Sequence, residues 1–359
     1  MKKQHVFALV ILWAVLTAFA WISPEKEISA SERRPLAQFP AVSLDSVANG
    51  KFMKDFETFS LDQFPLRDGF RTVKSVFHYY VLGQKDNNDI YLHDGYAAKQ
   101  EYPLNVDSVN HALNRFNHIY EKYLTDSQIY MAVVPDKGYY LAEKAGQLAM
   151  DYEALFDMVE AGMPWARHID LRSSLSLTDY YRTDTHWRQE NLFTAAQTVC
   201  GALGVNAPER IRATVLQPPF YGVYFGQAAL PMEPDVLAIL ELDYLENCTV
   251  YDHETGKTTS VYDLSKLDSR DLYDVYLSGA RALLTIENPN GQPDKELIVF
   301  RDSFGSSLVP LLVQDYSKVT LVDTRYISSD LLDQFMEFKG QDVLFLYSSL
   351  ILNSSSAIK

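Results

Sequence analysis

Short apolar segments with high β propensity alternate with helix-like segments in the last third of the chain, and this alternation constrains the fold more than any other feature. The apolar segments span residues 297–300, 319–322 and 343–347, and the helix-like segments between them span residues 307–316 and 329–338. Repeated strand–helix–strand order is the signature of a parallel sheet, because each helix carries the chain back to the start of the next strand. The sequence therefore predicts an α/β fold, with a mostly parallel sheet flanked by helices.

The rest of the chain supplies further elements of the same kind. Residues 129–134 form a continuous apolar run that suits a central strand covered on both faces. Apolar spacing predicts helices over residues 106–123, 152–163 and 189–203, two helices within 52–82 that are broken at Pro65, and strands near 88–96, 168–171, 273–277 and 282–286.

The alternation of strands and helices is lost between residues 213 and 271. This stretch contains an aromatic and glycine-containing run at 218–226. It also contains Glu254-Thr255-Gly256-Lys257, which predicts a β-hairpin within residues 248–262. We therefore expect residues 213–271 to be a β-rich inserted segment or cap beside the functional site.

An acidic and an imidazole side chain stand two residues apart in Thr183-Asp184-Thr185-His186-Trp187. In an extended or turn segment, residues two apart project to the same side, which places the Asp184 carboxylate beside the His186 ring. Such a carboxylate can hold the ring's tautomer and stabilise its protonated form, as a general base requires before it deprotonates a serine. The local sequence also fits a second reading, in which Asp184 caps the following helix and His186 is an ordinary packed residue.

Ser303 is the best nucleophile for such a pair. A β-type apolar run ends abruptly in Asp302-Ser303-Phe304-Gly305, and a new apolar segment of helical spacing follows. A serine at a strand-to-helix turn is raised from the sheet edge, and backbone N–H groups at the helix start can stabilise an oxyanion. A metal site has little support, because His186 lacks an HxH or HExxH companion, and we expect no cofactor.

Six short segments, taken in order, resemble a known family. They are Asp62-Gln63-Phe64-Pro65-Leu66-Arg67-Asp68, Val134-Pro135-Asp136-Lys137, Thr183-Asp184-Thr185-His186-Trp187, Tyr276-Leu277-Ser278-Gly279, Arg301-Asp302-Ser303-Phe304 and Asp323-Thr324-Arg325-Tyr326. Together they resemble the SGNH-hydrolase-like proteins of bacterial envelopes, in the branch that includes the alginate O-acetyltransferases and the family named for its Asp-His-His-Trp (DHHW) motif. The resemblance covers about residues 45–350.

The resemblance implies that Asp184, His186 and Ser303 form a catalytic triad, in a branch in which the Asp-x-His pair precedes the serine. Two positions depart from the family pattern. Thr185 replaces the His that gives the family its name, and Arg301 stands where a Lys is expected. Neither position belongs to the triad, so the departures bear on sub-family and substrate more than on the chemistry.

Two further residues are candidates for contacts around the reacting group. Lys137 follows the end of the strand predicted at 129–134, where an open α/β sheet usually binds ligands. The same residue also fits a solvated lysine beside a turn at Asp136. Gly279, between the apolar stretches at 273–277 and 282–286, is a candidate for a second oxyanion donor.

Three more residues are candidates for substrate contacts. Arg325 and Tyr326 follow a strand end, and both position and resemblance favour substrate binding, with a structural ion pair as the rival reading. Trp187 can stack on a sugar ring, but a tryptophan beside a histidine more often serves packing.

The chain begins with a basic flank and an uncharged apolar run from residue 6 to residue 22, which is typical of an export signal. Ala18-Phe19-Ala20 fits a cleavable signal peptide, but the run is nearly long enough for an uncleaved membrane anchor. We favour the anchor for residues 1–22, because Trp21 and Ile22 extend the run and two lysines favour a cytoplasmic N-terminus. Either way, the rest of the chain is expected to be extracytoplasmic.

Residues 23–44 are rich in Pro, Ser, Glu and Arg and lack apolar periodicity, so we expect a linker that holds the folded part off the membrane surface. One SGNH-hydrolase-like domain is predicted over residues 45–350. It contains the inserted segment and is followed by a tail at 351–359.

Charge and cysteine content exclude some functions. The formal net charge is -15, and no cluster of Lys and Arg follows Arg34. A phosphate backbone is bound through basic patches, so the sequence argues against a nucleic-acid partner. Cys200 and Cys248 can form one disulfide outside the cell or remain two buried thiols, and their spacing decides neither.

These features together predict an extracytoplasmic, serine-dependent O-acetyltransferase or esterase that acts on a cell-envelope or secreted polysaccharide through an acyl-serine intermediate. The polysaccharide is the expected acceptor, and the resemblance implies a membrane-bound O-acyltransferase as the acetyl donor system. The resemblance favours transfer over hydrolysis. The alternative is a non-catalytic glycan-binding or polysaccharide-assembly protein that keeps the SGNH-like fold.

Overall fold

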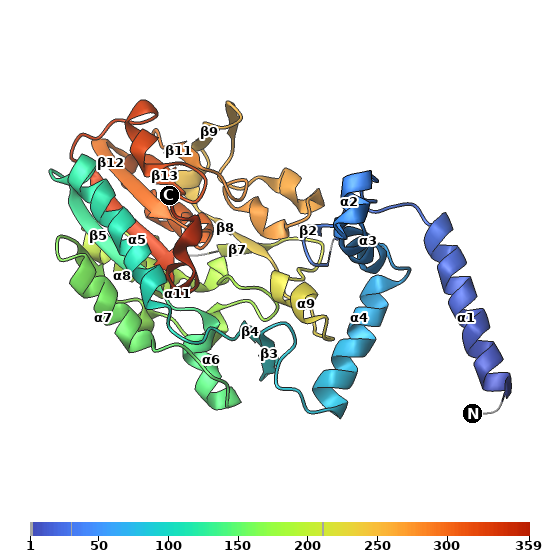
Figure 1. The fold of residues 1–359 in the computed structure, drawn as a ribbon. Coiled ribbons are helices and arrows are strands. Elements are labelled where there is room, and N and C mark those ends of the chain that lie inside the picture. The colour runs from blue at the N-terminus through green and yellow to red at the C-terminus, as the bar shows by residue number, and fades with distance from the viewer. Residues whose placement is uncertain (1–2, 30, 210–211) are drawn as a thin grey trace. The chain divides into compact units, whose positions relative to one another are not determined.

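The computed structural model describes residues 3–29, 31–209 and 212–359 (Figure 1). Met1 and Lys2 of the predicted export segment and Ala30 of the predicted linker lie outside the described residues. The chain forms two compact units, a small unit of residues up to 88 with 225–232 and a large unit of residues 89–224 with 233–359. The domain predicted over 45–350 therefore includes residues of both units.

An eight-stranded sheet forms the centre of the large unit. Its strands lie in the order β10 (Lys257–Thr259), β9 (Thr249–Asp252), β11 (Leu283–Glu287), β13 (Tyr316–Val322), β12 (Gln292–Arg301), β14 (Asp342–Ser348), β5 (Gln128–Val134) and β6 (Arg167–Ile169). The five strands from β13 to β6 run parallel, and β11, β9 and β10 are antiparallel to their neighbours. The predicted fold class, a mostly parallel sheet flanked by helices, is confirmed.

Strand β5 shows how both faces of this sheet are covered. The odd-numbered residues from Ile129 to Val133 belong to a buried cluster that includes α5 (Val106–Ile119) and α7 (Tyr152–Gly162). The even-numbered residues belong to the opposite cluster, which includes α8 (Phe193–Leu203). A strand that is buried on both faces is apolar at successive positions, which explains the continuous apolar run in the sequence.

Several other strands and helices of the large unit lie near the positions predicted from the sequence. They are β3 (Ile90–His93) with β4 (Tyr96–Lys99), α5 with the π-helical turn η2 (Tyr120–Leu124), α7, β6, the 3-10 turn η5 (Gln189–Asn191) with α8, and β11. A further helix, α6 (Lys137–Ala145), follows β5 directly, and the Asp136 side chain caps it by accepting from the Gly138 N–H.

The hairpin predicted within the inserted segment is confirmed. β9 and β10 pair antiparallel on either side of Gly256, whose φ of 67° lies in the left-handed region that favours glycine. β9 also pairs with β11, so the hairpin extends the main sheet and is not part of a cap. A separate two-stranded sheet joins β7 (Arg212–Val215) to β8 (Ala238–Glu241).

Three predicted elements are wrong in type or length. Residues 273–277 are not a strand but begin within the 3-10 helix η8 (Leu272–Val275), because the Asp271 side chain caps it by accepting from the Tyr273 N–H at 3.0 Å. The helix predicted over 307–316 is only α10 (Gly305–Leu308), followed by the 3-10 helix η9 (Val309–Leu312), in which Pro310 has no N–H to continue an α-helix. The helix predicted over 329–338 is the 3-10 helix η10 (Ser329–Gln334).

The small unit consists mainly of helices. They are α1 (Lys3–Ile22), α2 (Leu44–Ala48), α3 (Lys51–Asp62), α4 (Arg67–Val76), the π-helical turn η1 (Phe77–Val81) and, where the chain returns, most of α9 (Val223–Ala228). By length and composition α1 can cross a membrane, since its most apolar window has a mean hydropathy of 2.2 and is not buried. The two helices predicted within residues 52–82, with a break at Pro65, are confirmed as α3 and α4.

The described residues of the predicted linker, 23–29 and 31–44, contact α3 and its C-cap at several points and do not form an unattached tether. The stretch contains the short strands β1 (Ile28–Ser29) and β2 (Arg34–Pro35), which pair with each other. The Arg34 guanidinium donates to both carboxylate oxygens of Asp62, at 2.6 and 2.9 Å. The stretch lacks apolar periodicity because polar contacts of this kind hold it in place.

Cys200 and Cys248 are both buried and free. Burial raises the pKa of the Cys200 thiol to about 12 and that of the Cys248 thiol to about 11. Of the two alternatives left open by the sequence, the structure therefore contains the pair of buried thiols, both protonated at neutral pH.

Phe345, on β14, offers a test of the core. Its ring is fully buried and stacks on Phe300, with ring centroids 4.7 Å apart. We predict that Phe345→Ala lowers the free energy of unfolding by about 3–5 kcal/mol, because the change removes apolar burial and leaves a cavity. Denaturant titration followed by tryptophan fluorescence measures this loss.

Phe335→Ala, at a side chain that is 50% exposed, is the control and should change the free energy of unfolding by less than about 0.5 kcal/mol. Equal effects of the two changes would contradict the assignment of the core.

Candidate active site

The Asp-x-His motif lies in a tight loop of the large unit. Tyr180 and Trp187 form an isolated antiparallel bridge, and the Tyr181 N–H donates to the His186 carbonyl at 3.0 Å. These contacts close residues 180–187 into a narrow loop, which we call the motif loop. Its tip carries Thr183, Asp184 and Thr185.

Two buried ionisable side chains hold the motif loop. The Asp235 carboxylate accepts from the backbone N–H groups of Arg182 and Thr183, at 2.8 and 2.7 Å, and from the Thr183 hydroxyl at 2.5 Å. From α6, the Lys137 ammonium donates to the carbonyls of Tyr181 and Arg182, at 2.9 and 3.3 Å. Asp235 thus binds backbone N–H groups of the motif loop, and Lys137 binds backbone carbonyls of the same part of the loop.

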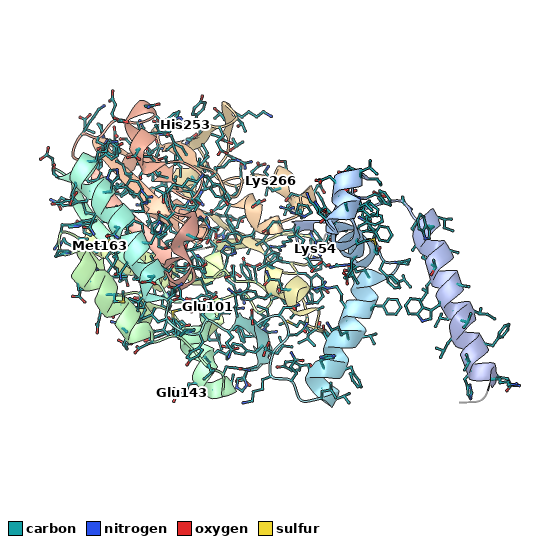
Figure 2. All side chains as sticks on the ribbon, in the orientation of Figure 1. Lys54, Glu101, Glu143, Met163, His253 and Lys266 are labelled. Carbon is teal, nitrogen blue, oxygen red and sulfur yellow. The ribbon has the colours of Figure 1, made fainter. Side chains whose placement is uncertain are left out.

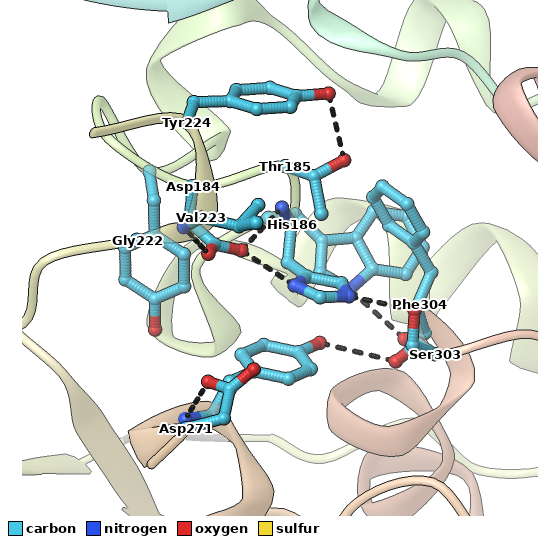
Figure 3. Close-up of polar contacts among 12 residues, drawn as sticks. Asp184, Thr185, His186, Gly222, Val223, Tyr224, Asp271, Ser303 and Phe304 are labelled. Atoms are coloured by element: carbon cyan, nitrogen blue, oxygen red, sulfur yellow. Dashed lines mark hydrogen bonds and ion pairs between the residues drawn. The ribbon is translucent and has the colours of Figure 1, made fainter. Parts of the chain in front are cut away.

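Asp184 and His186 are directly bonded. Asp184 Oδ1 lies 2.6 Å from His186 Nδ1 and accepts from the His186 backbone N–H at 3.0 Å (Figure 3). Asp184 Oδ2 accepts from the Val223 N–H at 2.8 Å, and the carboxylate is fully buried. The helix-cap reading of Asp184 is wrong, because α8 begins at Phe193 after Leu192 and has no side-chain cap.

Ser303 meets the other ring nitrogen of His186. Its Oγ lies 2.8 Å from His186 Nε2, two residues beyond the end of β12 (Figure 3). The Asp302 side chain shapes this turn, since it accepts from the Phe304 N–H at 3.0 Å and from the Ser348 N–H at the end of β14 at 2.7 Å. The structure therefore brings Asp184, His186 and Ser303, predicted from segments far apart in the chain, into one hydrogen-bonded series.

An aromatic wall fixes the imidazole ring. Tyr273 stacks on His186, with centroids 3.8 Å apart and planes 7° from parallel. The Tyr273 hydroxyl pairs with Ser307 Oγ at 2.8 Å, which ties this ring to the helix after the serine. Together with the bond to Asp184, the stacking leaves the His186 ring one orientation, with Nε2 toward Ser303.

Oxyanion donors at the serine turn are fewer than predicted. The Phe304 N–H is bound by Asp302, the Gly305 N–H by the Asp302 carbonyl and the Ser306 N–H by the Ser303 carbonyl. Within the described part of the chain, the Ser303 N–H has no acceptor. Gly279 is not a free donor either, because its N–H donates to the Tyr276 carbonyl at 3.1 Å.

Lys137 and Trp187 are buried structural residues. The solvated-lysine reading of Lys137 is wrong: the side chain is 2% exposed, and burial lowers the pKa of its ammonium to about 7. Trp187 is fully buried and donates from Nε1 to Ser307 Oγ at 2.8 Å. Packing is therefore its role in this structure, and its ring has no face open to a sugar.

Arg325 and Tyr326 lie just beyond the end of β13. The Arg325 guanidinium binds Asp323 through two hydrogen bonds, at 2.8 and 2.6 Å, as the ion-pair reading expected. Tyr326 is 52% exposed. Of the five predicted contact residues, Tyr326 alone has a largely exposed side chain.

Sequence reasoning missed Asp235 and Tyr273. Asp235 lies in the inserted segment without a motif around it, and Tyr273 lies in a stretch predicted as a strand. Tyr276, three residues further on, makes the stretch aromatic, and this was the one available signal for Tyr273. No group of three or more His, Cys, Asp or Glu suited to a metal ion is found among the described residues.

Part of the chain matches a known protein family. Residues 167–322 match a family model described as DHHW protein. A search of curated proteins finds no match to the chain.

Solved structures share the fold. A DHHW family protein from Eubacterium siraeum DSM 15702 is 19% identical, with a TM-score of 0.61 over 76% of this chain and 95% of that chain. Bacillus cereus PatB1, solved with a sulfonyl adduct, is 17% identical, with a TM-score of 0.56 over 73% of this chain and 95% of that one. The O-acetyltransferase domain of Pseudomonas putida AlgJ is more distant, at 14% identity and a TM-score of 0.44 over 74% and 92%.

Gly222 tests how closely the inserted segment packs on the motif loop. A Cβ built at Gly222 would lie 2.2 Å from Asp184 Cβ. We predict that Gly222→Ala lowers the melting temperature, because either segment has to move. Gly201→Ala on α8 is the matched control: nothing lies within 4 Å of its added Cβ, and alanine favours a helix by about 0.5–1 kcal/mol. An unchanged melting temperature in Gly222→Ala would contradict this packing.

Lys137 predicts a pH dependence of stability. Because its folded pKa, about 7, is below the unfolded value of 10.5, the folded state binds fewer protons between these pH values. Its contribution to stability therefore rises with pH from 7 to about 10.5, by at most about 1.4 kcal/mol per pH unit. We predict that the melting-temperature difference between wild type and Lys137→Met shifts in favour of wild type over this range.

The exposed Lys144, on the same helix, provides the control for that experiment. Melting curves at several pH values should show no such trend between wild type and Lys144→Met. A constant difference for Lys137→Met would mean that the buried ammonium keeps its proton throughout this range.

Proposed function

The resemblance to the DHHW family is confirmed by the match over residues 167–322, and from this premise we propose that the protein is a serine-dependent O-acyltransferase of the cell envelope. The acyl group is proposed to be acetyl, and the acceptor a hydroxyl of a cell-envelope or secreted polysaccharide. Esterase activity on the same acyl-serine is the hydrolytic variant of this function.

One observation carries the proposal: the continuous series from Asp184 through His186 to Ser303. The two contacts of the ring, 2.6 Å at Nδ1 and 2.8 Å at Nε2, assign each nitrogen a separate partner. A carboxylate at Nδ1 keeps the proton on that atom and leaves Nε2 unprotonated to accept the serine proton. This is the arrangement that nucleophilic catalysis by a serine needs.

The proposed reaction has two halves. Ser303 Oγ attacks the acyl carbonyl while His186 Nε2 takes its proton, and the donor's leaving group departs with a proton returned by His186. The acyl-serine is then attacked by a glycan hydroxyl, whose proton passes to His186 and then to Ser303 Oγ as the ester bond to serine breaks. Asp184 remains ionised and stabilises the imidazolium in both halves.

The Ser303 N–H is the proposed oxyanion donor from the serine turn. Its neighbours Phe304, Gly305 and Ser306 use their N–H groups within the turn, whereas the Ser303 N–H has no acceptor in the described chain. A donor that is held by a rigid turn stabilises the developing charge without reorganising at the moment of reaction.

The polysaccharide acceptor is proposed from the resemblance of the sequence to the family and from the position of one exposed residue. Tyr326, exposed beyond the end of β13, is proposed to contact the acceptor, with Arg325 holding the turn beneath it through Asp323. Location outside the cytoplasm and anchoring by α1 are supported by the length and composition of that helix.

We predict that Ser303 is acylated by activated esters. With p-nitrophenyl acetate, the full-length protein should give a burst of p-nitrophenol and gain the mass of one acetyl group on Ser303. Ser303→Ala should lose the burst, and His186→Ala should lower the acylation rate by about 10²–10⁴-fold, because the general base is lost. A sulfonyl fluoride, chosen because PatB1 was solved with a sulfonyl adduct, should label the same oxygen.

Ser354→Ala controls for non-specific acylation, since Ser354 is exposed and no histidine hydrogen-bonds to it within the described part of the chain. Labelling that is equal in wild type and Ser303→Ala would refute the nucleophile. Glycan binding that survives Ser303→Ala in a protein that is never acylated would instead establish the non-catalytic binding role.

A further inference from the structure

The helix formed by α4 and η1 in the small unit exposes its apolar side chains. These are Phe70, Val73, Phe77 and Tyr80, together with Leu66 at the N-cap of α4, and each is between 48% and 72% exposed. The spacing of three, four and three residues from Phe70 to Tyr80 places these four along one side of the helix. We call these five residues the apolar stripe.

The polar side of the same helix faces the interior of the small unit. The Arg71 guanidinium donates to the Gly226 carbonyl at 2.9 Å and lies 3.3 Å from the Glu32 carboxylate. Ser75 is only 2% exposed, and its Oγ donates to the Arg71 carbonyl at 2.8 Å and accepts from Asn87 at 2.9 Å.

This arrangement is the reverse of a normal surface helix. A helix at the surface of a water-soluble domain buries its apolar stripe and exposes its polar side. Here the polar contacts fix the helix with its apolar side outward, so ordinary core packing does not account for the stripe. A contiguous exposed apolar surface of this kind indicates a partner that is itself apolar.

The start of the stripe is held close to the end of α1. Lys26 lies four residues after α1, and its backbone N–H and carbonyl both bond to the Gln63 side chain at 2.9 Å. Gln63 lies three residues before Leu66. Even fully extended, these seven residues span roughly 25 Å, and the fifteen residues of α4 and η1 add about 22 Å. An anchored α1 therefore keeps the stripe within reach of the bilayer surface.

We propose that the apolar stripe lies in the interfacial region of the membrane that α1 anchors, with lipid acyl chains as its partner. The proposal rests on the proposed anchoring by α1 and is independent of the acyl-serine chemistry. Lipid is favoured over a second copy of the chain, because the tether to α1 brings the stripe to the bilayer whether or not another copy is present. Mixed aliphatic and aromatic residues, with a tyrosine near the end, suit a helix that lies in the interface.

The consequence is a two-point attachment of the small unit. A single spanning helix leaves the attached unit free to tilt, whereas a helix that lies in the interface limits that tilt. Seven polar contacts connect the two attachment points. They join Lys26 to Gln63, Arg34 to Asp62, Arg67 to Glu32, and Arg71 to Glu32 and Gly226.

Fluorescence quenching of the full-length protein in phosphatidylcholine and phosphatidylglycerol vesicles tests the proposal. A single cysteine, from Val73→Cys or Phe77→Cys, is labelled with the fluorophore NBD, and the quencher is a doxyl group on the lipid acyl chains. Cys200 and Cys248 do not compete, because both thiols are buried and protonated. Asp68→Cys is the matched control: Asp68 is exposed on the same helix and lies 3.8 Å from Arg71 on the polar side.

We expect doxyl lipids to remove most of the fluorescence at positions 73 and 77 and little of it at position 68. Equal, weak quenching at all three positions would overturn the proposal. Blue-shifted emission at 73 and 77 that doxyl lipids do not quench, and that grows with the protein-to-lipid ratio, would assign the stripe to a second copy and would also overturn it.

A second measurement needs no substitution, so a misfolded variant cannot obscure the result. Wild-type protein is irradiated in vesicles that contain a lipid with a diazirine on its acyl chain, and the adducts are mapped by mass spectrometry. Adducts within residues 66–82 as well as within α1 are expected, and adducts confined to α1 would refute the proposal. The p-nitrophenyl acetate burst of the same sample reports separately on the proposed function.

Discussion

The motif loop is held by two buried ionisable side chains, an acid and a base, and the geometry of the site depends on them. Asp235 binds the N–H groups of Arg182 and Thr183, while Lys137 binds the carbonyls of Tyr181 and Arg182. A buried charge is costly unless it is paired or hydrogen-bonded, so each is stable only while the loop keeps its shape. The loop in turn gives Asp184 and His186 their positions. The contacts that stabilise the motif loop are therefore the same contacts that hold the side chains of the site in position.

Separate parts of the large unit meet around His186. The serine comes from the end of a parallel strand, and the acid–base pair comes from the motif loop. The inserted segment contributes Val223 and Asp235, and the 3-10 helix η8 that follows it contributes Tyr273. The strand fixes Ser303 through the sheet, whereas the ring of His186 is fixed by stacking and by Asp184. Because each part is held by its own contacts, the 2.8 Å contact between Nε2 and Ser303 Oγ needs no movement of the backbone.

The elements that could be predicted from the sequence are those whose signal is local. The continuous apolar run at 129–134 predicts a strand that is buried on both faces, as the structure shows. The Asp-x-His pair and the serine turn are recognisable as short sequence patterns. Asp235 could not be predicted, because its bonds to Arg182 and Thr183 join residues more than fifty positions apart. The strand predicted at 273–277 failed for a related reason: apolar residues there pack around Tyr273 and Tyr276 in an aromatic cluster, where a capped 3-10 helix replaces an extended strand. Lys137 was placed correctly at a strand end, but burial by distant segments, invisible in the local sequence, decided its role.

The two departures from the family pattern lie next to the hydrogen-bonded series and not within it. Thr185 Oγ accepts from the Tyr224 hydroxyl at 3.1 Å, on the far side of the loop tip from the bond between Asp184 and His186 (Figure 3). Arg301 is fully buried under the serine turn, where its Nη1 donates to Ser306 Oγ at 3.0 Å. Its side-chain carbons also fill the space into which a Cβ at Gly305 would project, at 2.9 Å. A change at position 185 thus alters a contact with Tyr224, and a change at 301 alters the packing under the turn, while both leave each nitrogen of His186 with its partner. Variation at these positions is therefore compatible with constant chemistry at the serine. Figure 2 shows the side chains of the described residues on the ribbon.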